Sequence, residues 1–129
     1  MKHLKISIEA IPHKSQRYPT VGDYFFKKGI EQIKVSKINA KEEFLIAIHE
    51  LTEWFLTEQR GIKEKDISKF DKKFEQERKK GLHSNSAEPG FDKRAPYRKE
   101  HVFATKVEKM LAKELKINWK KYSKELNKL

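Results

Sequence analysis

The chain has 129 residues, with 30 Lys and Arg against 19 Asp and Glu, so its formal net charge is +11, and it contains no cysteine. A chain of this length forms one domain, and without cysteine it can have neither a disulfide framework nor a thiolate metal site. No apolar run reaches the roughly 18 residues of a membrane span, and the N-terminus lacks the apolar block of a signal peptide. We therefore expect a single soluble, cytoplasmic domain over residues 1–129.

The first third of the chain has the pattern of β structure. Apolar residues at every second position predict a strand over residues 4–11, with Leu4, Ile6 and Ile8 on its apolar face. Two further alternating segments, residues 20–26 and 30–37, flank a Lys-Lys-Gly turn and predict a β-hairpin. Residues 1–38 are therefore expected to form the β-rich part of the domain.

The rest of the chain, residues 39–129, has the pattern of three to four helices. Asn39 and Glu42 have the spacing of a capping box, which predicts a helix from Ala40 to Arg60. Further helices are predicted over residues 64–80, from 97 to about 115, and from 118 onward, with a loop at 81–97. Strands followed by helices predict an α+β fold.

Three of the predicted helices carry an apolar stripe when residues are plotted at 100° each. The stripe of the first helix is Phe44, Ile48, Leu51 and Phe55, widened by Leu45, Trp54 and Leu56. The second helix has a narrow stripe of Ile67, Phe70 and Phe74, and the stripe of the third is Phe103, Val107, Met110 and Leu111. We expect these stripes to face the core.

The most specific short motif is His49-Glu50-Leu51-Thr52-Glu53 on the first helix. Residues four apart lie on one face of a helix, so His49 and Glu53 can bind the same divalent metal. The motif resembles the HExxH active-site helix of zinc metallopeptidases, with Glu53 in the place of the second histidine. This resemblance implies metal-dependent hydrolysis with Glu50 as the general base that accepts a proton from metal-bound water.

Further ligands are sought beside the apolar stripes of the other helices. His101 borders the stripe of the third helix and is the best third ligand; Asp71 lies about 40° from Ile67 around the second helix and, with Glu108, is a candidate fourth. Histidines and carboxylates suit zinc or another first-row divalent ion. The predicted metal ligands are His49, Glu53, His101 and Asp71. The alternative is that these are hydrogen-bonded boundary residues and that the motif is purely structural.

A second informative segment is EPGFDKRAPYRKEH at residues 88–101, which ends with His101 near the start of the third helix. Together with HELTE, FDKKFE at 70–75 and RYPTVGDYFF at 17–26, this segment resembles a group of small uncharacterised proteins encoded by bacteriophages and prophages. The resemblance implies a shared fold and a phage setting, but no activity. Residues 88–97 are expected to form either an active-site lid or a rigid cover that packs Phe91 and Tyr97 over the core.

Charge distribution supports a second candidate function. The two ends of the chain are basic, whereas residues 40–62 hold five glutamates against one Lys and one Arg. The basic C-terminal segment 116–124 could contact phosphates and stack a base on Trp119 or Tyr122, or these rings could anchor a terminal helix. The alternative to a hydrolase is therefore a non-enzymatic, phage-type basic protein that binds nucleic acid or an acidic host protein weakly and in a salt-sensitive manner.

Overall fold

A computed structural model describes residues 2–129. Three strands form one sheet: β1 (Ile6–Ile11), β2 (Gly22–Lys27) and β3 (Ile30–Ser36). Their order is β1-β3-β2, with β1 parallel and β2 antiparallel to β3. At the turn between β2 and β3, Lys28 and Gly29 have positive φ values of 52° and 80°, as a two-residue hairpin turn requires. The predicted hairpin is confirmed.

Four helices follow the sheet. They are α1 (Ala40–Gln59), α2 (Glu64–Lys79), α3 (Arg98–Glu114) and α4 (Trp119–Asn127), and two short 3-10 turns, η1 (His13–Ser15) and η2 (Pro89–Phe91), lie in the loops. Strands followed by helices in one compact domain confirm the predicted α+β class. Over residues 2–129, none of the helices combines the length and the apolar character that crossing a membrane requires.

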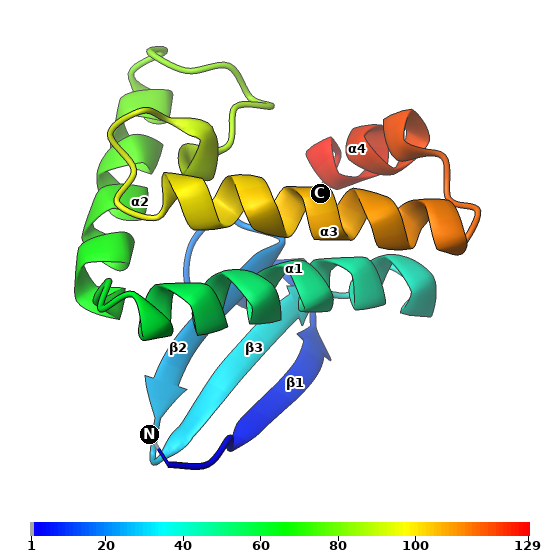
Figure 1. The fold of residues 1–129 in the computed structure, drawn as a ribbon. Helices are drawn as coiled ribbons and strands as arrows, with labels where there is room; N and C mark the ends of the chain where they lie inside the picture. Colours follow the sequence, from blue (N-terminus) through cyan, green and yellow to red (C-terminus); the bar gives the residue numbers. More distant parts are fainter. Residues whose placement is uncertain (1) are drawn as a thin grey trace.

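Helix α1 forms the middle layer of the domain. It packs on β2 and β3 on one side and on α3 on the other, and α1 and α3 run side by side in opposite directions (Figure 1). An ion pair of 2.6 Å between Arg60 and Glu100 joins the end of α1 to the start of α3. Because α1 is covered on two sides, its residues line both the hydrophobic core and the interface with α3.

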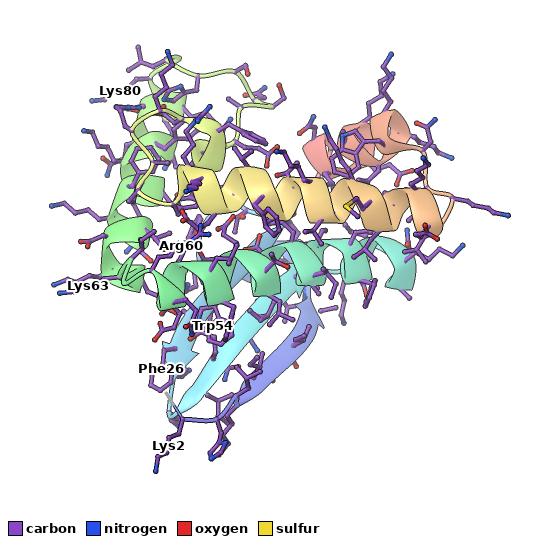
Figure 2. The ribbon with its side chains drawn as sticks, viewed as in Figure 1. Lys2, Phe26, Trp54, Arg60, Lys63 and Lys80 are labelled. Carbon is purple, nitrogen blue, oxygen red and sulfur yellow. The ribbon has the colours of Figure 1, made fainter. Side chains whose placement is uncertain are left out.

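The hydrophobic core lies between the sheet and α1 and extends to α4. Ile33 and Leu45 are fully buried in it, and Trp54 is 2% exposed. Tyr122 of α4 is 1% exposed, which confirms that this ring anchors the C-terminal helix. The Tyr122 ring is therefore not available for stacking on a nucleic-acid base. Figure 2 shows many of the remaining side chains pointing outward, including Lys63 and Lys80, which flank α2.

The prediction that the apolar stripes face the core is confirmed for Leu45 and Trp54 of α1 and for Ile67 and Phe74 of α2, but it is wrong for several large residues of α1 and α3. Phe44 is 48% exposed and Phe55 38%, while Phe103 is 51% and Met110 69% exposed. Since α1 buries the side toward the sheet and the side toward α3, the exposed part of its stripe lies on a third side. Helix α3 instead turns small and polar side chains toward α1, namely His101, Ala104, Glu108 and Ala112.

Two local predictions also need correction. The first strand begins at Ile6 rather than residue 4, and Leu4 and Ile8 are 62% and 50% exposed because β1 is an edge strand away from the helix that covers β2 and β3. At the start of α1, the Asn39 side chain accepts a hydrogen bond of 3.0 Å from the Glu42 amide, as predicted. The reciprocal bond of the capping box is absent from the described residues, since Glu43 rather than Glu42 accepts from the preceding backbone, at Ile38.

Glu31 of β3 is a buried acid whose ionisation weakens the fold. It is 3% exposed, its Oε2 has no hydrogen-bond partner in residues 2–129, and burial together with neighbouring Glu64 raises its pKa to about 9. The unfolded chain ionises Glu31 near pH 4.5, so the folded state, which holds the proton more tightly, loses stability as the pH rises from about 4.5 to 9. A neutral side chain of the same shape, such as Gln, would remove this loss of stability.

We therefore expect Glu31→Gln to raise the free energy of unfolding by about 1–3 kcal/mol at pH 8 and to leave it nearly unchanged at pH 4. Urea unfolding at the two pH values measures the difference. Asp66→Asn, a change at an exposed acid of α2, serves as the control and should alter stability by less than about 0.5 kcal/mol. An equal gain at both pH values would show that the effect is not one of ionisation.

Candidate metal centre

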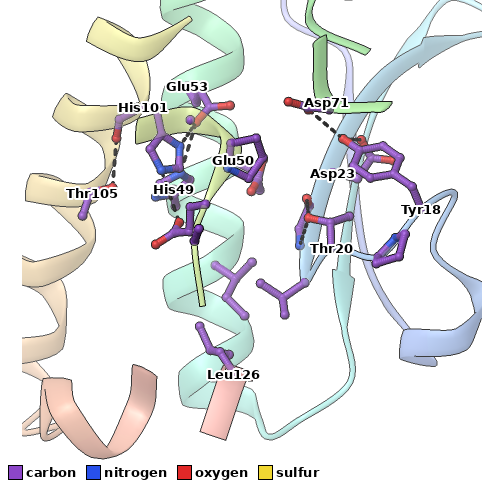
Figure 3. A pocket seen from close by; sticks show the side chains of 18 of the residues that line it. Tyr18, Thr20, Asp23, His49, Glu50, Glu53, Asp71, His101, Thr105 and Leu126 are labelled. Atoms are coloured by element: carbon purple, nitrogen blue, oxygen red, sulfur yellow. Dashed lines mark hydrogen bonds and ion pairs between the residues drawn. The ribbon is translucent and has the colours of Figure 1, made fainter. Parts of the chain in front are cut away.

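Three predicted ligands meet at the interface between α1 and α3 (Figure 3). Nε2 of His49 lies 3.2 Å from both Oε2 of Glu53 and Nδ1 of His101, and the last two atoms are 2.7 Å apart. Ligand atoms bound tetrahedrally to zinc at 2.0–2.1 Å are roughly 3.3 Å from one another. One donor atom of each side chain is therefore placed to share an ion with little movement. Within residues 2–129, no other group of three such side chains converges in this way.

The cluster is assembled by local helix geometry and by one close backbone contact. His49 and Glu53 are one turn apart on α1, as the sequence predicted, and His101 lies in the first turn of α3 opposite them. The backbone of Gly90 in η2 lies directly against the His101 ring, so that a Cβ at this position would be 2.2 Å from Cγ of the imidazole. Only glycine leaves room for His101 to take this position.

The atoms of the cluster that face away from its centre are held by further side chains. Nδ1 of His49 lies 2.8 Å from Oε1 of Glu108, whose Oε2 accepts a hydrogen bond of 2.6 Å from the Tyr122 hydroxyl. The Tyr24 hydroxyl donates to Oε1 of Glu53 at 2.9 Å, which leaves Oε2 toward the centre. A carboxylate behind a histidine is the usual arrangement around a bound metal, because it fixes the ring and raises its basicity.

His101 has a weaker contact on its outer side. Its Nε2 lies 3.2 Å from Oε1 of Glu88, without the alignment of a hydrogen bond. The ring of Phe91 meets the His101 ring edge-on with centroids 4.6 Å apart. Phe91 is 41% exposed and Tyr97 is 3% exposed. Residues 88–97 therefore cover His101, with Tyr97 packed inside as expected and Phe91 half outside.

Opposite charges stabilise the cluster in the absence of an ion. Burial lowers the pKa of His49, but hydrogen bonds to Glu108 and Glu53 outweigh it and raise the pKa well above its usual value. Burial also lowers the pKa of His101, but Glu53 and Glu88 outweigh it and raise that pKa to about 9. At Glu53 burial raises the pKa, but the two histidines outweigh it and lower that pKa to about 2. A metal ion would therefore have to displace protons from the histidines.

Glu50 lies in the same cavity as the cluster. The cavity has a volume of about 540 Å³, and Glu50 points into it between the cluster and the wall that carries Tyr18 and Asp23 (Figure 3). Gly22 makes room for this side chain, since a Cβ at that position would lie 2.5 Å from Oε1 of Glu50. Burial and the charge of Glu53 raise the pKa of Glu50 well above its usual range. The carboxyl group is thus suited to hold a proton near neutral pH.

The fourth predicted ligand, Asp71, lies outside the group of three. Its Oδ1 accepts a hydrogen bond of 2.5 Å from the Tyr97 hydroxyl, and its Oδ2 accepts one of 3.1 Å from Tyr18. Burial raises the pKa of Asp71 to about 7. It belongs to the opposite wall of the cavity (Figure 3), and its role as a metal ligand stays a prediction. Glu108, the other candidate, contacts His49 instead.

Sequence reasoning did not find the tyrosines that complete the site. Tyr24 comes from β2 and Tyr122 from α4, so their contacts with Glu53 and Glu108 depend on how distant elements pack. Neither tyrosine belongs to a local motif with metal-ligand spacing. The only available signal was that buried phenols need a hydrogen-bond acceptor, and buried carboxylates are the strongest ones.

Comparison of the chain with protein-family models, with curated proteins and with solved structures finds no match. The resemblances to phage-encoded proteins and to the HExxH helix stay predictions.

Proposed function

We propose that this protein is a metal-dependent hydrolase in which His49, Glu53 and His101 hold a divalent cation. The observation that carries the proposal is the convergence of three donor atoms within 3.2 Å of one another. All three side chains are buried, with exposed fractions of 4–7%, so an ion held by them would lie in a site of low dielectric, where its attraction to Glu53 is strong. The contacts that Glu108 and Tyr24 make with the outer atoms of His49 and Glu53 support the same conclusion.

Zinc is the ion that this set of ligands favours. Two histidines and one glutamate form a known ligand set of catalytic zinc sites, and three protein ligands leave a fourth position open for water. Zinc lowers the pKa of such a water to about 7. Glu50 is proposed as the general base that accepts the proton of the attacking water and returns it to the leaving group. Asp71 is not one of these three ligands and lies on the opposite wall of the cavity.

Metal analysis after purification without an affinity tag tests this proposal. We expect about one equivalent of zinc per chain, lost on dialysis against a chelator at acid pH and recovered when zinc is added back. Less than about a tenth of an equivalent of any transition metal, with no uptake on addition, would contradict the proposal. One equivalent of iron or manganese would keep the site and replace zinc as its metal.

A binding role for the basic surface remains the alternative function. It predicts affinity for nucleic acid that falls steeply with salt, with a slope set by the number of lysine–phosphate contacts. Unchanged affinity between 50 and 200 mM salt, on a scale where phosphate binding typically loses several orders of magnitude, would count against it.

A further inference from the structure

The exposed apolar stripes of α1 and α3 lie on one side of the molecule, away from the cavity. On α1, Phe44, Ile48 and Phe55 are rotated by roughly 120–160° from Glu50, which points into the cavity. On α3, Phe103, Val107 and Met110 are rotated by roughly 140–160° from the cavity-lining Thr105. Because α1 and α3 lie side by side (Figure 1), the two stripes form one apolar face.

The two stripes also match level by level along the helices. The contacts between His49 and Glu108 and between Arg60 and Glu100 fix the register of the antiparallel pair. In this register Phe55 is level with Phe103, Ile48 with Val107, and Phe44 with Met110. Four of these six side chains are at least 38% exposed: Phe44, Phe55, Phe103 and Met110. A periodic apolar face of this kind on two paired helices is the usual inner face of a four-helix bundle.

We propose that a second copy of this chain covers this face. A two-fold axis along the seam between α1 and α3 would place α1 of one copy over α3 of the other, antiparallel and in the same three apolar layers. Every helix of the resulting bundle would then have antiparallel neighbours, which is the arrangement of up-down four-helix bundles. In this dimer each apolar layer joins the same pairs of residues that are level with one another in the single chain.

Charges at the ends of the face fit this occupant. Lys41 of α1 is level with Glu114 of α3, and Glu58 of α1 is level with Lys99 of α3, so both cross-copy pairs unite opposite charges. All four side chains are exposed, and none makes an ion pair within residues 2–129. Helices of 17 and 20 residues placed side by side present roughly 500–600 Å² per copy, near the lower end of stable interfaces. We therefore expect a dimer with a dissociation constant in the micromolar range.

Analytical ultracentrifugation from about 1 to 500 μM tests the dimer. The expected mass at high concentration is twice the 15.4 kDa of one chain. The double variant Phe103→Asp with Met110→Asp should weaken dimerisation by at least about 30-fold, as loss of central interface residues does. Leu82→Asp, which changes a 65% exposed apolar residue beyond α2, is the matched control and should leave the dimer intact.

A charge exchange keeps the test decisive if the double variant folds poorly. Lys41→Glu and Glu114→Lys should each weaken the dimer several-fold, because each sets two like charges opposite one another, and the combined variant should restore it. Far-ultraviolet circular dichroism and a cooperative thermal unfolding transition confirm that each variant is folded. A monomer at 500 μM, a dimer unaffected by Phe103→Asp with Met110→Asp, or no recovery in the combined charge variant would overturn the proposal.

Discussion

His101→Ala should lower zinc affinity by at least about a hundredfold. His101 supplies one of three converging donor atoms, and the loss of a direct ligand must exceed the 10–100-fold cost of losing an outer partner. Bound metal stabilises only the folded state, so zinc at a hundred times its dissociation constant adds about 2.7 kcal/mol and roughly 10 °C to the melting temperature of the unmodified chain. His101→Ala should lose most of that increase. Competition with a chromophoric chelator and thermal unfolding with and without zinc measure both effects.

The matched control for this loss is His83→Ala. His83 stacks on Phe74 with ring centroids 3.9 Å apart and pairs with Glu77, so its removal changes a histidine outside the cluster. Glu108→Gln should have an intermediate effect of about 10–100-fold, because it alters the carboxylate behind His49 but keeps the ligand. Equal zinc affinity in His101→Ala and His83→Ala would mean that the cluster is a hydrogen-bonded structural element.

Secondary structure was largely predictable because its determinants are local. The Lys28-Gly29 turn, the Asn39 cap and the proline- and glycine-rich segment 81–97 each act within a few residues, and the observed elements begin and end close to the predicted positions. The pair His49 and Glu53 was predictable for the same reason, since a spacing of four residues fixes their relation on any helix.

The faces of the helices were less predictable because they depend on what packs against them. A single apolar stripe marks the buried side of a helix that has one neighbour. Helix α1 has neighbours on two sides, and the side toward α3 is lined by the polar groups of the cluster, so Leu45 and Trp54 are buried while Phe44 is not. If the second copy covers the stripes, hydrophobic periodicity correctly marked a buried face but not the chain against which it is buried.

The remaining ligands were harder to predict because they lie on helices other than α1. His101 and Asp71 both border apolar stripes, and they were predicted as the third and the fourth ligand. The fold brings the first turn of α3 to the middle of α1, whereas Asp71 is drawn toward Tyr18 and Tyr97 on the far wall of the cavity. Interhelical distances of this kind arise from packing and have no signature in a single sequence.

Glu50→Gln should retain zinc and lose hydrolysis by at least a hundredfold. Gln has the shape of Glu and fits the space beside Gly22, but it cannot accept a proton from water. In the ion-free cluster, burial and the charge of Glu53 hold the pKa of Glu50 high, and a cation held by Glu53 would favour its ionised, basic form. Removal of a general base typically costs a factor of 100 to 10,000.

The comparison uses zinc-loaded protein and an activated ester such as 4-nitrophenyl acetate, with zinc content measured on the same samples. Asp66→Asn, a change at an exposed acid of α2 that does not line the cavity, should hydrolyse the ester at the unmodified rate. A Glu50→Gln variant that binds zinc and remains fully active would remove Glu50 from the reaction while leaving the metal centre in place. Loss of zinc together with activity would instead identify Glu50 as part of the metal's support, because a general base acts on the water and leaves the affinity of the three ligands unchanged.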